Sequence, residues 1–134
     1  MGPTLKRYLV AAAVACAAGF AASVVEAAGE KVGDTQMCVP LINIESTPVI
    51  DNKTILIKMR EKNGFKRIDL VGPCSGLYMA NGFSHTTSTN DLCTSDPLRV
   101  NEPVGATCMI KQIVTISAAE AKELQSRKPG GDKQ

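Results

Sequence analysis

Cysteines set the strongest limit on the architecture of this chain. Cys16 lies in an apolar N-terminal run, and the other four are Cys38, Cys74, Cys93 and Cys108. The gaps between these four are 36, 19 and 15 residues, far longer than the C-x₂₋₄-C spacing of zinc sites, and no C-x-x-C redox motif is present. In a small exported domain, an even number of widely spaced cysteines predicts two structural disulfides.

The N-terminal segment has the organisation of a secretory signal. Lys6 and Arg7 precede an uncharged, Ala- and Val-rich run over residues 8–25, which is the charged region followed by the apolar region of a signal peptide. Small and β-branched residues favour cleavage after Ala27, so we expect a mature chain that begins at Ala28. This cleavage removes Cys16 and leaves an even number of cysteines.

Two alternatives to a cleaved signal remain open. The uncharged run of about 18 residues is near the lower limit for a membrane anchor, although its Ala-rich composition makes it weakly hydrophobic. Residues 13–16 also resemble a lipoprotein processing site with Ala where Leu is usual, yet the apolar stretch before Cys16 is short and continues unchanged after it. Lipidation at Cys16 and a retained anchor are therefore the weaker interpretations.

Charge and aromatic content exclude several classes of partner. The formal net charge is +2, which is too small to steer the chain onto nucleic acid. Beyond residue 27 the aromatic residues are Phe65, Tyr78 and Phe83, fewer than a platform for stacking nucleic-acid bases requires. We therefore expect no nucleic-acid partner.

The central part of the sequence predicts a β-hairpin. Ile55, Ile57 and Met59 alternate with other residues within 49–60, and a second strand-like run follows over residues 65–71. Such alternation with β-branched residues is typical of strands. Asn63-Gly64 lies between the two runs, and Asn-Gly is a strong hairpin signal.

The remaining segments predict further short strands and one helix. Residues 39–44 are apolar and contain Pro40, which favours a strand start or an edge strand. Residues 80–91 read as a long loop or a weak strand pair, residues 98–100 as a short strand, and residues 107–116 as the last long strand, with strict alternation of its faces. Ser117 and Glu120 form a capping box, which opens a helix from residue 118 to about residue 127.

Together these patterns predict a mainly β fold, a small antiparallel barrel or sandwich of five or six short strands with a short C-terminal helix, stapled by disulfides. The expected organisation is a signal peptide over 1–27, a flexible lead-in over 28–37, a single domain over 38–127 and a flexible tail over 128–134. Among the three pairings that four cysteines allow, we favour a nested one, Cys74 with Cys93 and Cys38 with Cys108.

One group of basic residues is a candidate contact site. Five cations crowd the predicted hairpin and suit contact with an anionic envelope surface; the competing interpretation is a charged hairpin end that keeps an edge strand from aggregating. The five are Lys58, Arg60, Lys62, Lys66 and Arg67.

The sequence also contains one candidate for catalysis. His85 is the single histidine, and Asp91 and Asp96 follow it, but no nucleophile elbow or other catalytic motif accompanies them. We expect no cofactor and no metal. The leading hypothesis is a non-catalytic exported module, periplasmic or envelope-associated, with a binding or structural role; the alternative is a small hydrolase built around His85, Asp91 and Asp96.

Two short motifs carry a resemblance to a known family. A C-x-G-L motif begins at Cys74, and an L-C-x-x-D motif begins at Leu92 and has Ser95 where family members often have Gly. Over residues 38–124 the chain resembles a proteobacterial family of small exported four-cysteine proteins known only as a domain of unknown function. The resemblance implies export, a four-cysteine framework and a β-rich fold, and it brings no activity or catalytic residue with it.

Overall fold

The computed structural model describes residues 30–62 and 64–127. The described elements are mostly short strands, with one 3-10 helix and two α-helices. They are β1 (Thr35–Gln36), β2 (Cys38–Pro40), η1 (Leu41–Asn43), β3 (Ile44–Ser46), β4 (Thr54–Met59), β5 (Phe65–Leu70), α1 (Leu77–Ala80), β6 (Phe83–His85), β7 (Asp91–Cys93), β8 (Pro97–Val100), β9 (Thr107–Ile116) and α2 (Ala118–Ser126).

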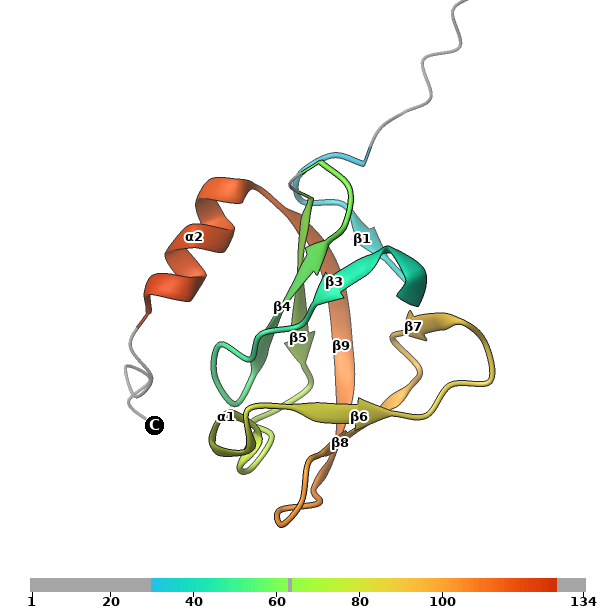
Figure 1. Cartoon of the computed structure of the whole chain (residues 1–134), viewed down its shortest axis with the longest axis vertical. Helices are drawn as coiled ribbons and strands as arrows, with labels where there is room; N and C mark the ends of the chain where they lie inside the picture. The colour runs from blue at the N-terminus through green and yellow to red at the C-terminus, as the bar shows by residue number, and fades with distance from the viewer. Residues whose placement is uncertain (1–29, 63, 128–134) are drawn as a thin grey trace, which may run out of the picture.

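The strands form a curled antiparallel sheet and a small second sheet (Figure 1). The order in the main sheet is β3-β4-β5-β9-β8-β6, and β1 pairs with the far end of β9. The main sheet curls into a half-barrel, whereas β2 and β7 pair only with each other. The expected mainly β fold with a short C-terminal helix is therefore confirmed.

The predicted hairpin is present as β4 and β5. The two strands pair from Thr54 opposite Asp69 to Lys58 opposite Phe65, and the Met59 amide donates a hydrogen bond of 2.9 Å to the Gly64 carbonyl. The connection between the strands therefore covers residues 60–64 and includes Gly64 of the expected Asn-Gly signal. Lys62 has a positive φ of 30° in this connection, and Asn63 lies outside the described residues.

Strand β9 has the predicted bounds but not the predicted faces. Asp69 pairs with Gln112 and Leu70 pairs with Ile110, so Lys111 has no partner on β5. This extra residue is a β-bulge, which shifts the alternation of side chains by one position. Ile110 and Ile113 consequently lie in the same core cluster, and the expectation that they occupy opposite faces is wrong.

The main sheet is covered on both faces. Its inner face packs against β2 and β7, and the buried side chains there include Val39 and Leu92, which lie in one core cluster with Leu98 of β8. Its outer face packs against α2 through Ala121 and Leu124. The sheet therefore has two cores on opposite sides, which explains why Leu56 is as buried as its neighbours Ile55 and Ile57.

Helix α2 begins as the capping box predicts. The Ser117 side chain accepts a hydrogen bond of 3.1 Å from the Glu120 amide. In a complete capping box the Glu side chain also accepts a hydrogen bond from the amide of the capping residue. Here the Glu120 carboxylate instead accepts a hydrogen bond from Arg67.

Two segments differ from expectation, and two others lie outside the described residues. The lead-in is ordered from residue 30: β1 pairs with β9, and the Gly33 amide donates to the Thr115 carbonyl at 2.8 Å. The prediction of a flexible lead-in is therefore wrong for residues 30–37. Residues 80–91 contain α1's end, β6 and the start of β7, and β6 pairs with β8. The predicted signal peptide and the predicted tail over 128–134 lie outside the described residues.

Candidate functional site

The five predicted cationic residues do not form one surface. Lys58 lies near the end of β4, and Arg60 and Lys62 lie in the connection that follows it. Lys66 and Arg67 are consecutive residues of β5. Because side chains alternate along a strand, these last two point to opposite faces of the sheet.

Lys66 points to the inner face and is buried. Its side chain is 3% exposed, and its Nζ forms an ion pair with the Glu30 carboxylate. Nζ also donates a hydrogen bond of 3.1 Å to the Oγ1 of Thr115, the residue opposite Lys66 on β9. A buried ammonium group needs such partners to offset its loss of hydration. Lys66 therefore ties the segment before β1 to the sheet and is not available to an external anion.

Arg67 points to the outer face, beside helix α2. Its guanidinium donates to both carboxylate oxygens of Asp69, at 2.7 and 3.0 Å, and to the Glu120 carboxylate at 2.6 Å. The hydrogen bonds to Asp69 are the main reason that the pKa of Arg67 is raised; partial burial opposes this shift, and the charges of Asp69 and Glu120 add to it. Gln112 donates to Asp69 at 2.7 Å and completes the network.

The other three cations remain near the hairpin end. Lys58 forms an ion pair of 3.2 Å with Glu45 on β3, in which both side chains are nearly half exposed. Arg60 is exposed, and its Nε donates to the Ile44 carbonyl at 3.1 Å. Lys62 is exposed as well. The candidate contact with an anionic surface is thereby narrowed from five residues to Lys58, Arg60 and Lys62.

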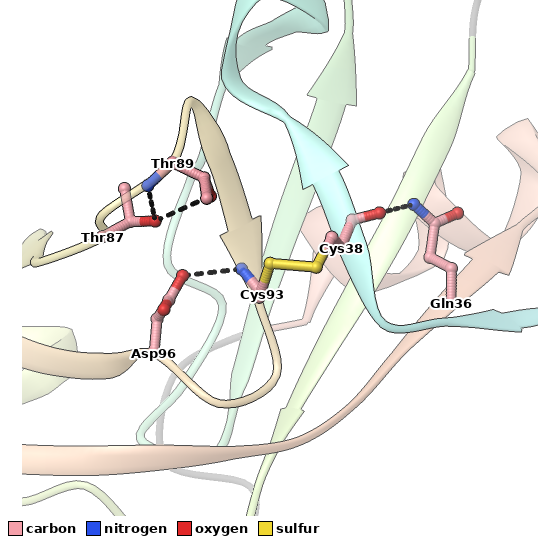
Figure 2. The surroundings of a disulfide bond; sticks show 6 residues. All are labelled: Gln36, Cys38, Thr87, Thr89, Cys93 and Asp96. Carbon is pink, nitrogen blue, oxygen red and sulfur yellow. Dashed lines mark hydrogen bonds between the residues drawn. A yellow bond between two sulfur atoms is a disulfide. The ribbon is translucent and has the colours of Figure 1, made fainter.

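The residues considered for catalysis have separate positions. His85 ends β6 and pairs with Leu98 of β8, whereas Asp91 begins β7 and pairs with Pro40 of β2. Asp96 accepts a hydrogen bond of 2.8 Å from the Cys93 amide, which caps the turn after β7 (Figure 2). Within residues 30–62 and 64–127, no hydrogen bond joins the side chains of His85, Asp91 and Asp96.

The first disulfide closes the two-stranded sheet. Cys38 of β2 lies directly opposite Cys93 of β7, and their Cα atoms are 4.0 Å apart. The Gln36 amide side chain donates to the Cys38 carbonyl at 2.8 Å (Figure 2). Cys38 is exposed, while the neighbouring pair, Val39 opposite Leu92, points into the core.

The second disulfide ties the turn after β5 to β9. It joins Cys74 and Cys108, whose Cα atoms are 5.8 Å apart. The Val71 amide donates to the Met109 carbonyl at 3.0 Å. The pairing of β5 with β9 therefore places Cys74 and Cys108 close to each other. Cys74 is 1% exposed.

The nested pairing predicted from the sequence is wrong. It assumed that Cys74 and Cys93 close the polar middle segment on itself, but that segment separates: β6 joins β8, and β7 joins β2. Strand pairing that is distant in sequence therefore decides the connectivity, and the four cysteines themselves are correctly assigned to disulfides.

Sequence reasoning missed the acidic partners of the buried and half-buried cations. These are Glu30 for Lys66, and Asp69 and Glu120 for Arg67. One signal was present: the alternation of β5 places Lys66 on the same face as Ile68 and Leu70, which indicates an inward-pointing lysine. No comparable signal identifies Glu30, which is 36 residues away from Lys66.

Residues 30–62 and 64–127 contain neither a cluster of metal-ligating side chains nor a helix that could span a membrane. Among the described residues, no group of three or more His, Cys, Asp or Glu side chains lies close enough together to hold a metal ion. In the same part of the chain, no helix has the length and apolar character needed to cross a bilayer.

Comparison with protein-family models, with curated proteins and with solved structures finds no match to this chain.

Proposed function

We propose that this chain is an exported, non-catalytic module of the bacterial envelope or periplasm with a binding or structural role. The observation that carries the proposal is the pair of disulfides, Cys38–Cys93 and Cys74–Cys108. Such bonds are typical of exported proteins, because reducing systems keep cytosolic thiols reduced. The N-terminal sequence, with Lys6 and Arg7 before an uncharged run, supports the same compartment.

The non-catalytic part of the proposal rests on how charged side chains are used. Lys66 holds the N-terminal segment, Arg67 links β5 to helix α2, and Asp96 caps a turn. These groups have partners within the fold that account for their positions. At the hairpin end, by contrast, Lys58, Arg60 and Lys62 remain half-exposed or exposed, although Lys58 pairs with Glu45 and Arg60 donates to the Ile44 carbonyl.

Fractionation of cells that produce the chain with a C-terminal tag tests export. We expect the protein in the periplasmic or envelope fraction, with an N-terminus at Ala28 and with both disulfides intact in mass spectrometry under non-reducing conditions. Recovery in the cytoplasmic fraction with four reduced cysteines would overturn the proposal. A pull-down from the same envelope fraction then identifies a protein partner.

Retention on anionic vesicles tests the hairpin end as a contact site. The variant combines Lys58→Gln, Arg60→Gln and Lys62→Gln, and the control combines Lys53→Gln, Lys111→Gln and Lys122→Gln, which removes the same charge from exposed residues elsewhere. On vesicles of phosphatidylglycerol and phosphatidylcholine, we expect the hairpin variant to lose several-fold more retention than the control, with a weaker salt dependence. Equal losses would show attraction by net charge alone and would exclude a specific contact.

A further inference from the structure

The two disulfides cross in the sequence. Along the chain the cysteines come in the order Cys38, Cys74, Cys93, Cys108, and the bonds join the first to the third and the second to the fourth. Neither bond joins cysteines that are neighbours in sequence. Each native bond therefore encloses one cysteine of the other bond.

Loop closure in the unfolded chain favours different bonds. The native pairs are 55 and 34 residues apart, whereas Cys93 lies 15 residues from Cys108 and 19 from Cys74. The closure probability falls roughly as the −3/2 power of loop length, so Cys93–Cys108 forms about 3-fold more readily than Cys74–Cys108 and about 7-fold more readily than Cys38–Cys93. On this basis only about one first bond in six is native.

Local structure does not bring Cys38 and Cys93 together early in folding. Strands β2 and β7, which carry Cys38 and Cys93, pair only with each other, and an isolated two-stranded sheet is at best marginally stable in water. Its buried pair, Val39 and Leu92, needs the completed half-barrel to pack against. Cys38 and Cys93 are therefore brought together only after most of the main sheet has formed.

Cys93 is the cysteine that we expect to form wrong bonds most often. A bond from Cys93 to Cys74 or to Cys108 uses one cysteine of each native bond, so a single wrong bond blocks both native bonds. It also holds β7 away from β2, because Cys93 lies directly opposite Cys38 in their pairing. Such a chain reaches the native fold only if the wrong bond is broken again.

From this geometry we propose that the protein is a client of a thiol–disulfide isomerase in the compartment to which it is exported, an inference that rests on the export part of the proposed function. The isomerase thiolate attacks a sulfur of a wrong bond, such as Cys93–Cys108, forms a mixed disulfide and releases the other cysteine as a thiolate. A thiolate of the client then attacks the mixed disulfide and releases the isomerase unchanged. One S–S bond breaks and one forms at each step, so no net electrons move; the initial bonds come from a separate disulfide oxidant that accepts two electrons per bond.

Burial gives the reshuffling a natural end point. Cys74 is 1% exposed in the folded chain, so an external thiolate cannot reach it once β5, β9 and the turn after β5 have packed. Cys38 remains exposed, but it is held opposite its native partner. Reshuffling therefore stops when the crossed pairs are reached.

Oxidative refolding of purified protein tests the proposal. The full chain carrying Cys16→Ser, so that four cysteines remain, is reduced in guanidinium chloride, diluted and oxidised either with diamide alone or with diamide followed by glutathione and a purified protein disulfide isomerase. The bonds are then mapped by non-reducing mass spectrometry after digestion with trypsin and chymotrypsin. Both proteases are needed because no Lys or Arg lies between Cys74 and Cys93, whereas Tyr78 and Phe83 do.

We expect bonds of Cys93 to Cys74 or Cys108 to dominate with diamide alone, and the isomerase to raise the crossed pairs several-fold to a majority. Crossed pairs in the majority with diamide alone would overturn the proposal, because folding would then select the bonds by itself. The same conclusion follows if the isomerase leaves the yield unchanged. Since the assay uses purified protein, its result does not depend on whether export is correct.

A variant with a single possible bond is the matched control. In the Cys16→Ser chain, Cys38→Ser combined with Cys93→Ser leaves only the Cys74–Cys108 bond possible, and Cys74→Ser combined with Cys108→Ser leaves only Cys38–Cys93. Neither can mispair, so we expect the isomerase to leave the yield of their bonds unchanged. An equal gain in these variants would show that the isomerase acts on folding rather than on pairing, and would also overturn the proposal.

Discussion

Two layers cover the central sheet, and they are held in different ways. Helix α2 covers the outer face and follows β9 after the single residue Ser117. The β2–β7 layer covers the inner face, and its two strands come from distant parts of the chain that the Cys38–Cys93 bond joins. The local layer is attached by chain continuity, a cap and an ion pair, whereas the non-local layer has a covalent cross-link.

The difference follows from the entropy of bringing chain segments together. A helix that directly follows its strand is already close to the face it covers, so few weak contacts are enough to hold it. Two strands separated by about 50 residues lose much more freedom when they pair, and a cross-link removes part of that loss from the unfolded state. A disulfide therefore stabilises the fold most between distant segments such as β2 and β7, which the Cys38–Cys93 bond joins.

Removal of the covalent link should have the largest effect. We expect Cys38→Ser with Cys93→Ser to lower the free energy of unfolding by about 4 kcal/mol, the loop-entropy value for a cross-link that spans roughly 55 residues. Guanidinium unfolding measures the loss. Hydrogen exchange at the Leu41 and Thr94 amides, which bond across this layer, should accelerate more than exchange in α2. Equal acceleration in both layers would contradict the comparison.

Truncation of one buried leucine in each layer compares their packing. Leu92→Ala in β7 should cost about 3 kcal/mol and Leu124→Ala in α2 about 2 kcal/mol, because a terminal helix relaxes into the cavity more easily than a cross-linked strand. The exposed neighbour Gln125→Ala serves as the control and should change stability by less than about 0.5 kcal/mol. A larger loss at Leu124 than at Leu92 would reverse the ranking of the two layers.

Loss of the ion pair should weaken the outer layer moderately. Arg67→Gln leaves Asp69 and Glu120 without their shared partner, and we expect a loss of about 1–2 kcal/mol that shrinks in high salt. The exposed pair Arg99–Glu102 provides the control, since Arg99→Gln should cost less than about 0.5 kcal/mol. Equal effects of the two substitutions would show that the Arg67 network does not hold the helix.

The helix cap should have the smallest effect. Ser117→Ala removes the acceptor for the Glu120 amide and should cost about 1 kcal/mol. Ser126 lies at the other end of α2, exposed, and donates to the Glu123 carbonyl; thermal unfolding of Ser126→Ala should differ little from that of the parent. A cap effect no larger than this control would indicate that β9 alone positions the helix.

Local patterns predicted those parts of the fold that local interactions create. The alternation at Ile55 and Ile57 gave β4, the run over residues 107–116 gave β9 with correct bounds, and Ser117 with Glu120 gave the start of α2. The bulge at Lys111 was hidden, because it is defined by how β9 pairs with β5 and not by the residues of β9 alone.

The candidate contact site shows the same division. Its five cations lie close together in the sequence around one turn, but closeness in sequence does not determine where a side chain points. Lys66 meets Glu30 and Arg67 meets Glu120 only because the fold brings distant segments to the two faces of β5. Arg60 and Lys62 stay exposed and Lys58 stays half-exposed at the end of the hairpin, because they lie beyond the two layers that cover the sheet.

The sequence by itself determined the mainly β character, the two-disulfide framework and the C-terminal helix. Side-chain alternation and the capping box act over a few residues, and the number of cysteines follows from composition. Only the tertiary structure decided which cysteines pair, which cations are buried and that Thr35 and Gln36 join the sheet. Each of these features depends on strands that lie tens of residues apart in the sequence. The free energy that selects their pairing comes from a core to which all of these strands contribute, so no short segment of the sequence reveals it.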